Sequence, residues 1–131
     1  MLLDAIRAAL ADLDRYAATL DATRLQHDRN AQNMVLHAMY SAVQAAIDLA
    51  YHVVADEGLP IPPTYRAGFE SLREAGWLAD DLAGRLAGWA GLRDIIAHGY
   101  LKIDFNRIHA ALHERNDLRD FVATMATRLA A

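Results

Sequence analysis

The residues with the clearest capacity for chemistry lie in one short stretch, from Gly91 to Tyr100. On a helix, Asp94 and His98 would share one face, whereas Arg93 and Tyr100 would share another. An arginine binds a phosphate group and stabilises the charge that grows on it during a reaction. A histidine close by titrates at about pH 6.5 and is suited to proton transfer. The two residue types together suit cleavage of a phosphodiester.

The same spacing has a purely structural interpretation. Arg93 could form an ion pair with Asp94 or Asp48, because a buried charge needs a partner. His98 could stabilise the C-terminal end of a helix, and the following Gly99 is typical of such an end. Structural ion pairs produce the same pattern as active sites, so the spacing alone leaves both interpretations open.

Other polar residues have weaker claims. Gln44, Asp48 and His52 follow one another at four-residue spacing on an otherwise apolar segment. They would either support Arg93 or His98 by orienting it, or form the solvated edge of a helix.

The histidine pair His109 and His113 makes a poor metal site, because two histidines without a carboxylate on the same face supply too few ligands. We therefore expect no metal and no cofactor. The sequence assigns no role to either of these histidines, nor a definite one to Gln44 or His52.

Composition narrows the class of protein. The chain has 131 residues, 54% of them hydrophobic and 23% charged, which predicts one globular domain over residues 1–131. Thirteen basic against seventeen acidic residues give a net charge of −4, so nucleic acid would be bound only at a local cationic site. The absence of cysteine excludes disulfide scaffolds, zinc fingers and thiolate catalysis. No apolar run reaches the roughly 20 residues that span a bilayer, and we expect a cytoplasmic protein without membrane contact.

Apolar residues at three- and four-residue spacing predict helices along most of the chain. All three prolines lie within residues 59–63, where the chain must break. Thr64 and Asp104 are expected to cap the helices that follow them, and Gly76 to end one. The prediction is an all-α, antiparallel bundle of four to five helices. The expected helices cover about 3–20, 31–56, 64–74, 80–99 and 105–129, with a frayed end and a turn at 21–30.

The helix expected at 80–99 is apolar on two opposite sides. One side carries Leu82, Leu86 and Trp89, and the other carries Gly84, Gly88, Gly91 and Ile95. Each glycine inside a helix costs about 1 kcal/mol relative to alanine, so a row of three suggests a close approach by another backbone. We expect a second copy of the chain to cover that side in a homodimer. The alternative is that helices of the same chain cover both sides.

A family resemblance links these observations. The run Arg93-Asp94-Ile95-Ile96-Ala97-His98-Gly99-Tyr100 resembles the R-x4-H-x-Y signature of the HepT-like toxins, a branch of the HEPN superfamily of helical ribonuclease domains. Further segments resemble that family in order and spacing, and the resemblance covers about residues 25–122. These segments are Asp28-Arg29, 45–50, Gly58, 62–65, 69–76 and 100–104.

The resemblance implies a HEPN-type fold and a metal-independent endoribonuclease, the toxin of a type VII-like toxin–antitoxin pair. Its active site would form at the homodimer interface, with Arg93 and His98 as catalytic residues and Asp94 as a polar residue that supports them. RNA would be cut by transesterification, in which the 2′-hydroxyl attacks the adjacent phosphate and leaves a 2′,3′-cyclic phosphate. His98 would move the proton and Arg93 would stabilise the charge.

The resemblance also implies a partner, an MntA-like nucleotidyltransferase antitoxin that attaches AMP to Tyr100 and silences the nuclease. Gly99 departs from the family pattern, since many relatives carry a glutamate there. A different class of function stays open at this point: a non-catalytic binding module that docks a nucleotidyltransferase, with Tyr100 as its acceptor or contact. The acidic net charge favours that alternative, because it promises no strong affinity for RNA.

Overall fold

The computed structural model of the protein describes residues 2–99 and 102–130, and these residues form seven α-helices and no strand. The helices are α1 (Leu2–Thr19), α2 (Ala22–His27), α3 (Arg29–Asp56), α4 (Tyr65–Glu74), α5 (Asp80–His98), α6 (Phe105–Leu112) and α7 (Asn116–Ala130). The all-α prediction is therefore confirmed, whereas the expected number of four to five helices is too low. Among the described helices, none combines the length and the apolar character needed to cross a membrane.

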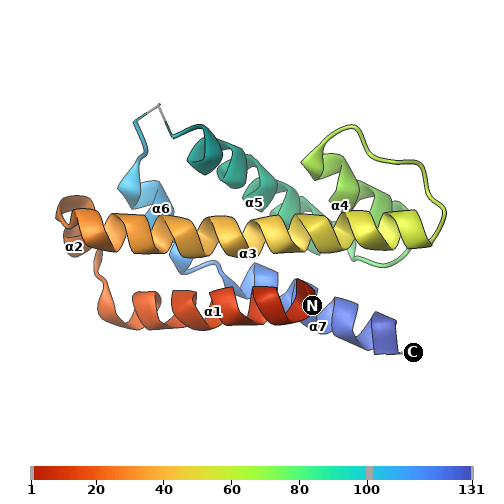
Figure 1. Cartoon of the computed structure of the whole chain (residues 1–131), viewed down its shortest axis with the longest axis horizontal. Helices are drawn as coiled ribbons and strands as arrows, with labels where there is room; N and C mark the ends of the chain where they lie inside the picture. The colour runs from red at the N-terminus through yellow and green to blue at the C-terminus, as the bar shows by residue number, and fades with distance from the viewer. Residues whose placement is uncertain (1, 100–101, 131) are drawn as a thin grey trace.

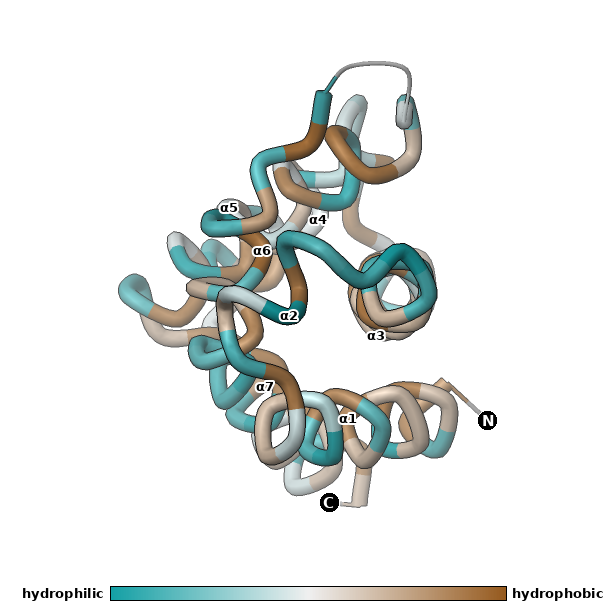
Figure 2. The backbone as a smooth tube through the Cα atoms, turned by 90° about the vertical axis from the view of Figure 1, so that its left-hand side faces the viewer, coloured by the Kyte–Doolittle hydropathy of each residue, from teal (hydrophilic) through white to brown (hydrophobic). Residues whose placement is uncertain are grey.

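The long helix α3 is the axis of the bundle. Helix α1 packs along one side of α3 and runs in the opposite direction, while α4 and α5 lie on the other side (Figure 1). Viewed along α3, the remaining helices form an arc from α1 and α7 to α5 and α4 (Figure 2). All seven helices contribute large side chains to one core. The largest fully buried ones are Ile6, Leu13, Leu25, Met39, Ile47, Phe69, Leu72, Leu86, Ile108, Leu112, Leu118 and Phe121.

Side-chain caps set the helix starts. The Thr64 hydroxyl accepts a hydrogen bond from the Ala67 N–H at 3.1 Å, and the Asp104 carboxylate accepts one from the Asn106 N–H at 3.0 Å. Both caps agree with the sequence prediction. Gly76, just after the end of α4, has a φ of 82°, as predicted for the residue that ends a helix.

The prediction of a frayed end and a turn at 21–30 is wrong. Asp21 accepts from the Arg24 N–H at 2.7 Å, and Asp28 accepts from the Ala31 N–H at 3.1 Å. Each carboxylate satisfies an N–H at a helix start, so the segment forms α2 and then enters α3 at once. The buried Leu25 fixes α2 to the core.

The expected helix over 105–129 is divided into α6 and α7, because a contact from a distant segment competes with helix continuation. Arg115 donates to the Leu112 carbonyl at 3.1 Å and to the Asp14 carboxylate at 2.7 Å. Arg119 reaches the same carboxylate at 2.7 Å. Hydrogen bonds from Arg119 and Arg115 keep the pKa of Asp14 below its usual range. The break therefore ties the C-terminal helices to α1.

Helix α5 is covered on one side only. Leu82, Leu86 and Trp89 are buried, as predicted for the inner side. On the other side, a Cβ added at any of the three glycines of the row would meet no described atom within 4 Å outside its own helix backbone. Ile95, on the same side, is 53% exposed. Within the described chain, the alternative that the bundle covers both sides is wrong.

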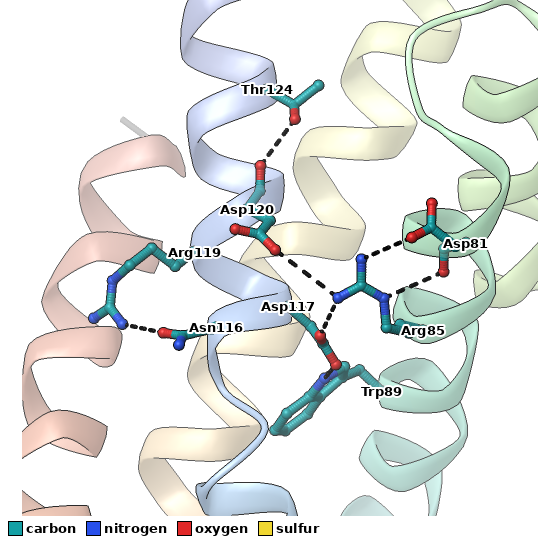
Figure 3. A network of polar contacts seen from close by, with 8 residues as sticks. All are labelled: Asp81, Arg85, Trp89, Asn116, Asp117, Arg119, Asp120 and Thr124. Atoms are coloured by element: carbon teal, nitrogen blue, oxygen red, sulfur yellow. Dashed lines mark hydrogen bonds and ion pairs between the residues drawn. The ribbon is translucent and has the colours of Figure 1, made fainter.

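A buried carboxylate joins the inner side of α5 to α7 (Figure 3). Asp117 is only 9% exposed and accepts from Arg85 Nη1 at 2.7 Å and from Trp89 Nε1 at 3.1 Å. Arg85 also approaches Asp81 at 3.5 Å and Asp120 at 3.9 Å, both exposed. Asp117 thus fixes the α5 segment just before Arg93.

We expect Asp117→Ala to lower the free energy of unfolding by about 2 kcal/mol, because it leaves the buried Trp89 N–H and the Arg85 guanidinium without their shared acceptor. The matched control is Asp120→Ala, which removes an exposed carboxylate from the same arginine and should change stability by less than about 0.5 kcal/mol. Urea unfolding followed by circular dichroism measures both. Equal losses in the two variants would contradict this assignment.

Candidate functional site

The candidate site is built around the C-terminal half of α5. This helix ends at His98, and Gly99 follows with a left-handed φ of 46° while its N–H donates to the Ile95 carbonyl at 3.3 Å. The helix end predicted from Gly99 is therefore confirmed. Arg93 and His98 are five residues apart, which separates them by about 7.5 Å along the helix axis. His98 is exposed, whereas Arg93 points toward α3.

Three hydrogen bonds hold the guanidinium group of Arg93. Its Nε donates to Gln44 Oε1 at 2.8 Å, its Nη1 to Asp94 Oδ1 at 3.1 Å, and its Nη2 to the Tyr40 hydroxyl at 3.1 Å. Each nitrogen is thus fixed by a different residue, and two of the three come from α3. A guanidinium carries five N–H groups, and the residues that the structure describes accept from three of them.

Aromatic rings complete the surroundings of Arg93. Its Cζ lies 4.7 Å from the centroid of the Tyr65 ring and 5.1 Å from that of the Tyr40 ring, both within cation–π range. The side chain is 14% exposed. Burial alone would lower the pKa of Arg93, but the hydrogen bonds with Asp94 and Tyr40 outweigh it and raise that pKa above its ordinary value. The positive charge is therefore permanent.

The polar row on α3 splits into two parts. Gln44 contacts Arg93 directly, and its Nε2 donates to Asp48 Oδ1 at 2.9 Å. Asp48 thus reaches the arginine through Gln44, while the carboxylate that pairs with Arg93 is that of Asp94. His52 belongs to the solvated edge of α3, where it lies 3.5 Å from the exposed Asp56.

The contacts of Arg93 that the structure gives include neither member of the histidine pair His109 and His113. Tyr100 lies outside the described residues, so its position relative to Arg93 is an expectation from the sequence. The rings of His109 and His113 stack edge to face with centroids 4.7 Å apart. Over the described residues, no group of three or more potential metal ligands gathers at these histidines or elsewhere.

Sequence reasoning missed Tyr40 and Tyr65 as partners of Arg93. Tyr40 precedes Gln44 by four residues and therefore extends the polar row on α3 by one turn. That spacing was a usable signal, although an aromatic residue inside an apolar segment is usually part of the core. Tyr65 is the first residue of α4, directly after the capping Thr64, and no pattern in the sequence relates it to Arg93.

The arrangement produces a fixed cation on the helix that ends at His98. Among the hydrogen-bond partners that the structure gives Arg93, Asp94 has the only formal charge, and its side chain is half exposed. The tyrosines and Gln44 are neutral, so they orient the guanidinium without cancelling its charge. Such a group is suited to binding an anion with little reorganisation, and the exposed imidazole of His98 ends the same helix.

Comparison with known proteins identifies relatives of this chain. The mRNA nuclease HepT of Shewanella oneidensis is 26% identical over 103 residues, which cover 78% of this chain and 77% of the relative. The solved structure of a tri-AMPylated Shewanella oneidensis HEPN toxin in complex with an MNT antitoxin matches the fold with a TM-score of 0.87. It is 21% identical, and the match covers 96% of this chain and 94% of that chain.

A second solved structure, the cytosolic protein YutE from Bacillus subtilis, matches with a TM-score of 0.77 at 13% identity, over 95% of this chain and 87% of that chain. These likenesses confirm the HEPN-type fold that the sequence predicted. The family model for Ribonuclease HepT-like proteins matches residues 6–125, nearly the whole length, and the chain therefore belongs to the HepT-like ribonuclease family.

Proposed function

We propose that this protein is the toxin of a HepT/MntA-like toxin–antitoxin pair and acts as a metal-independent endoribonuclease. The observation that carries the proposal is the Arg93 guanidinium, oriented by Tyr40, Gln44 and Asp94 on the helix that ends at His98. The related mRNA nuclease HepT supports RNA as the substrate. We also propose a cytoplasmic location, where the protein would meet cellular RNA.

The proposed reaction is a transesterification within RNA. The 2′-oxygen forms a bond to the adjacent phosphorus, and the bond from phosphorus to the 5′-oxygen of the next nucleotide breaks. The products are a 2′,3′-cyclic phosphate and a 5′-hydroxyl end. His98 takes the proton from the 2′-hydroxyl or gives one to the leaving oxygen. Arg93 stabilises the negative charge that accumulates on the phosphate oxygens.

The uncovered side of α5 suggests how the active site is completed. The three glycines and the exposed Ile95 leave room for a second copy of the chain beside the helix that carries Arg93 and His98. A homodimer through this face would bring the two α5 helices, and with them the exposed His98 of each copy, close together at a shared site.

Control by a partner is the third part of the proposal. The HEPN toxin in the similar solved structure is tri-AMPylated and is bound to an MNT antitoxin. We propose an MntA-like nucleotidyltransferase as the partner of this chain and Tyr100 as the residue that it modifies. The phosphate of an attached AMP carries about one negative charge and would compete with RNA phosphate for Arg93.

The competing function is a non-catalytic module that docks a nucleotidyltransferase, and the net charge of −4 favours it. The two functions differ in one measurement. The nuclease cleaves RNA in buffer containing EDTA, whereas the docking module binds the nucleotidyltransferase and leaves RNA intact.

We expect His98→Ala to reduce RNA cleavage about 10²- to 10⁴-fold, because the proton-transfer group is lost. Arg93→Lys should fail as well, since an ammonium group cannot bond Gln44, Asp94 and Tyr40 together in one plane. Cleavage of a labelled RNA in EDTA measures the effect. Arg15→Ala, an exposed arginine on α1, is the control that should retain activity. Undiminished cleavage by His98→Ala would reject the assignment.

For assembly, we expect a particle of about twice 14.5 kDa in light scattering. Gly88→Leu should shift the protein toward monomer, because the added side chain would overpack the contact between copies, typically by about 1–3 kcal/mol. Within one chain the change meets open space, so helicity should persist. Ala8→Leu adds the same side chain at an exposed position of α1 and should leave the dimer intact. A monomer at micromolar concentration in the unmutated protein would contradict the shared site.

For control, we expect incubation with an MntA-like nucleotidyltransferase and ATP to add AMP to the protein and to abolish cleavage. Tyr100→Phe should show no added adenylate in intact mass spectrometry and should continue to cleave. Tyr16→Phe removes a hydroxyl on α1 and should be modified like the unmutated protein. Adenylate that persists on Tyr100→Phe would show that another residue is the acceptor.

A further inference from the structure

We propose that Tyr40 is a substrate-binding residue: its hydroxyl donates a hydrogen bond to a non-bridging oxygen of the RNA phosphate that Arg93 binds. This inference rests on the proposed nuclease function and adds a group from α3 to the two groups on α5. Three observations carry it: the direction of the hydrogen bond between Tyr40 and Arg93, the position of Tyr40 relative to His98, and the other contacts that orient Arg93.

The direction of the hydrogen bond leaves the Tyr40 proton available. Arginine has donors only, so in the 3.1 Å contact with Arg93 Nη2 the Tyr40 oxygen must accept. The hydroxyl hydrogen then has to point elsewhere. In the described part of the chain, the structure gives that hydrogen no acceptor, and the Tyr40 residue is partly exposed. Accepting from a cation also polarises the O–H bond and makes it a better donor.

Chain direction places Tyr40 on the side of Arg93 where the reaction would occur. Helices α3 and α5 run in opposite directions across the bundle (Figure 1). Residues of α3 that precede Gln44 therefore lie toward the C-terminal end of α5. Tyr40 and Gln44 both contact Arg93, and of the two it is Tyr40 that lies toward His98. A phosphate bound between Arg93 and His98 is thus on the Tyr40 side.

Orientation of Arg93 does not rest on the Tyr40 hydroxyl alone. Gln44 and Asp94 fix two of the three guanidinium nitrogens, and the Tyr65 ring covers one face at 4.7 Å. The Tyr40 ring itself lies 5.1 Å from the guanidinium carbon. Phenylalanine would retain this packing, but it would remove the oxygen from both Arg93 Nη2 and the substrate, and the sulfur substitution separates these two effects.

The experiment compares the unmutated protein with Tyr40→Phe on an RNA that the unmutated protein cuts. We expect cleavage to fall by about tenfold or more, the range for one hydrogen bond to a charged group. The same RNA is prepared with sulfur in place of either non-bridging oxygen at the cleaved linkage. Sulfur accepts hydrogen bonds poorly, so the unmutated protein should cut one stereoisomer more slowly than the phosphate. In Tyr40→Phe that difference should disappear.

Binding of a 2′-O-methyl RNA, which cannot undergo the reaction, is measured in parallel. Tyr40→Phe should weaken binding by about tenfold, while Tyr16→Phe, a hydroxyl removed from α1, should leave binding and cleavage unchanged. Thermal unfolding checks that both variants are folded.

The outcomes separate the two proposals. Slower cleavage with unchanged 2′-O-methyl RNA binding and an unchanged sulfur effect would mean that Tyr40 acts only through Arg93, and would overturn the contact. Unchanged cleavage and binding would overturn it too. If the unmutated protein binds RNA without cutting it and Tyr40→Phe weakens that binding, the nuclease proposal fails and the contact stands. Absence of both cleavage and binding in the unmutated protein would reject both proposals.

Discussion

Burial of one guanidinium group is the constraint on which the candidate site depends. Arg93 is 14% exposed on the inner side of α5, and a charge in that position is tolerated only when hydrogen bonds replace the lost water. The replacement comes from two helices and is mostly neutral: Tyr40 and Gln44 from α3, with Asp94 from α5 itself. Because neutral partners compensate desolvation without cancelling charge, the group remains attractive to an anion. The fold thus holds a cation in a fixed orientation for chemistry, at the junction between its longest helix and the helix that carries the histidine.

The sequence predicted those parts of the fold and of the candidate site that depend on residues close together in the chain. Helix starts at Thr64 and Asp104 and the end at Gly99 depend on hydrogen bonds within a few residues, and the sequence predicted them. The four-residue spacing of Gln44, Asp48 and His52 left two interpretations open, a support for Arg93 or His98 and a solvated helix edge, and the structure shows that Gln44 contacts Arg93. The division between α6 and α7 depends on Arg115 meeting Asp14, a contact 101 residues distant, and no local pattern contains it. Tyr65 was missed for the same reason, since only packing of α4 against α5 brings its ring to Arg93.

Helix α5 has different surroundings on its two sides. On the inner side, Asp117 of α7 accepts hydrogen bonds from Arg85 and Trp89. One turn after Trp89, Arg93 forms its hydrogen bond with Gln44 of α3. On the outer side the glycine row leaves the backbone accessible. A single helix therefore couples the stability of the bundle to the orientation of the arginine, while its opposite side is available for assembly. In the homodimer proposed above, this division would let one protomer position Arg93 while the second protomer covers the outer side of α5.

The contrast between a buried Arg93 and an exposed His98 has an evolutionary consequence. A gene whose product harms its own cell is under continual selection for inactivating substitutions. Under the proposed function, a change at the exposed His98 would remove proton transfer while the buried core stays intact, so the inactive protein would still fold and would still occupy its partner. A change at Arg93 leaves Tyr40 and Gln44 without their hydrogen-bond donor. The fold loses stability, and the inactive protein is degraded more readily by proteases. Inactive relatives that remain folded and still bind the partner should therefore retain the arginine and should carry substitutions first at the histidine.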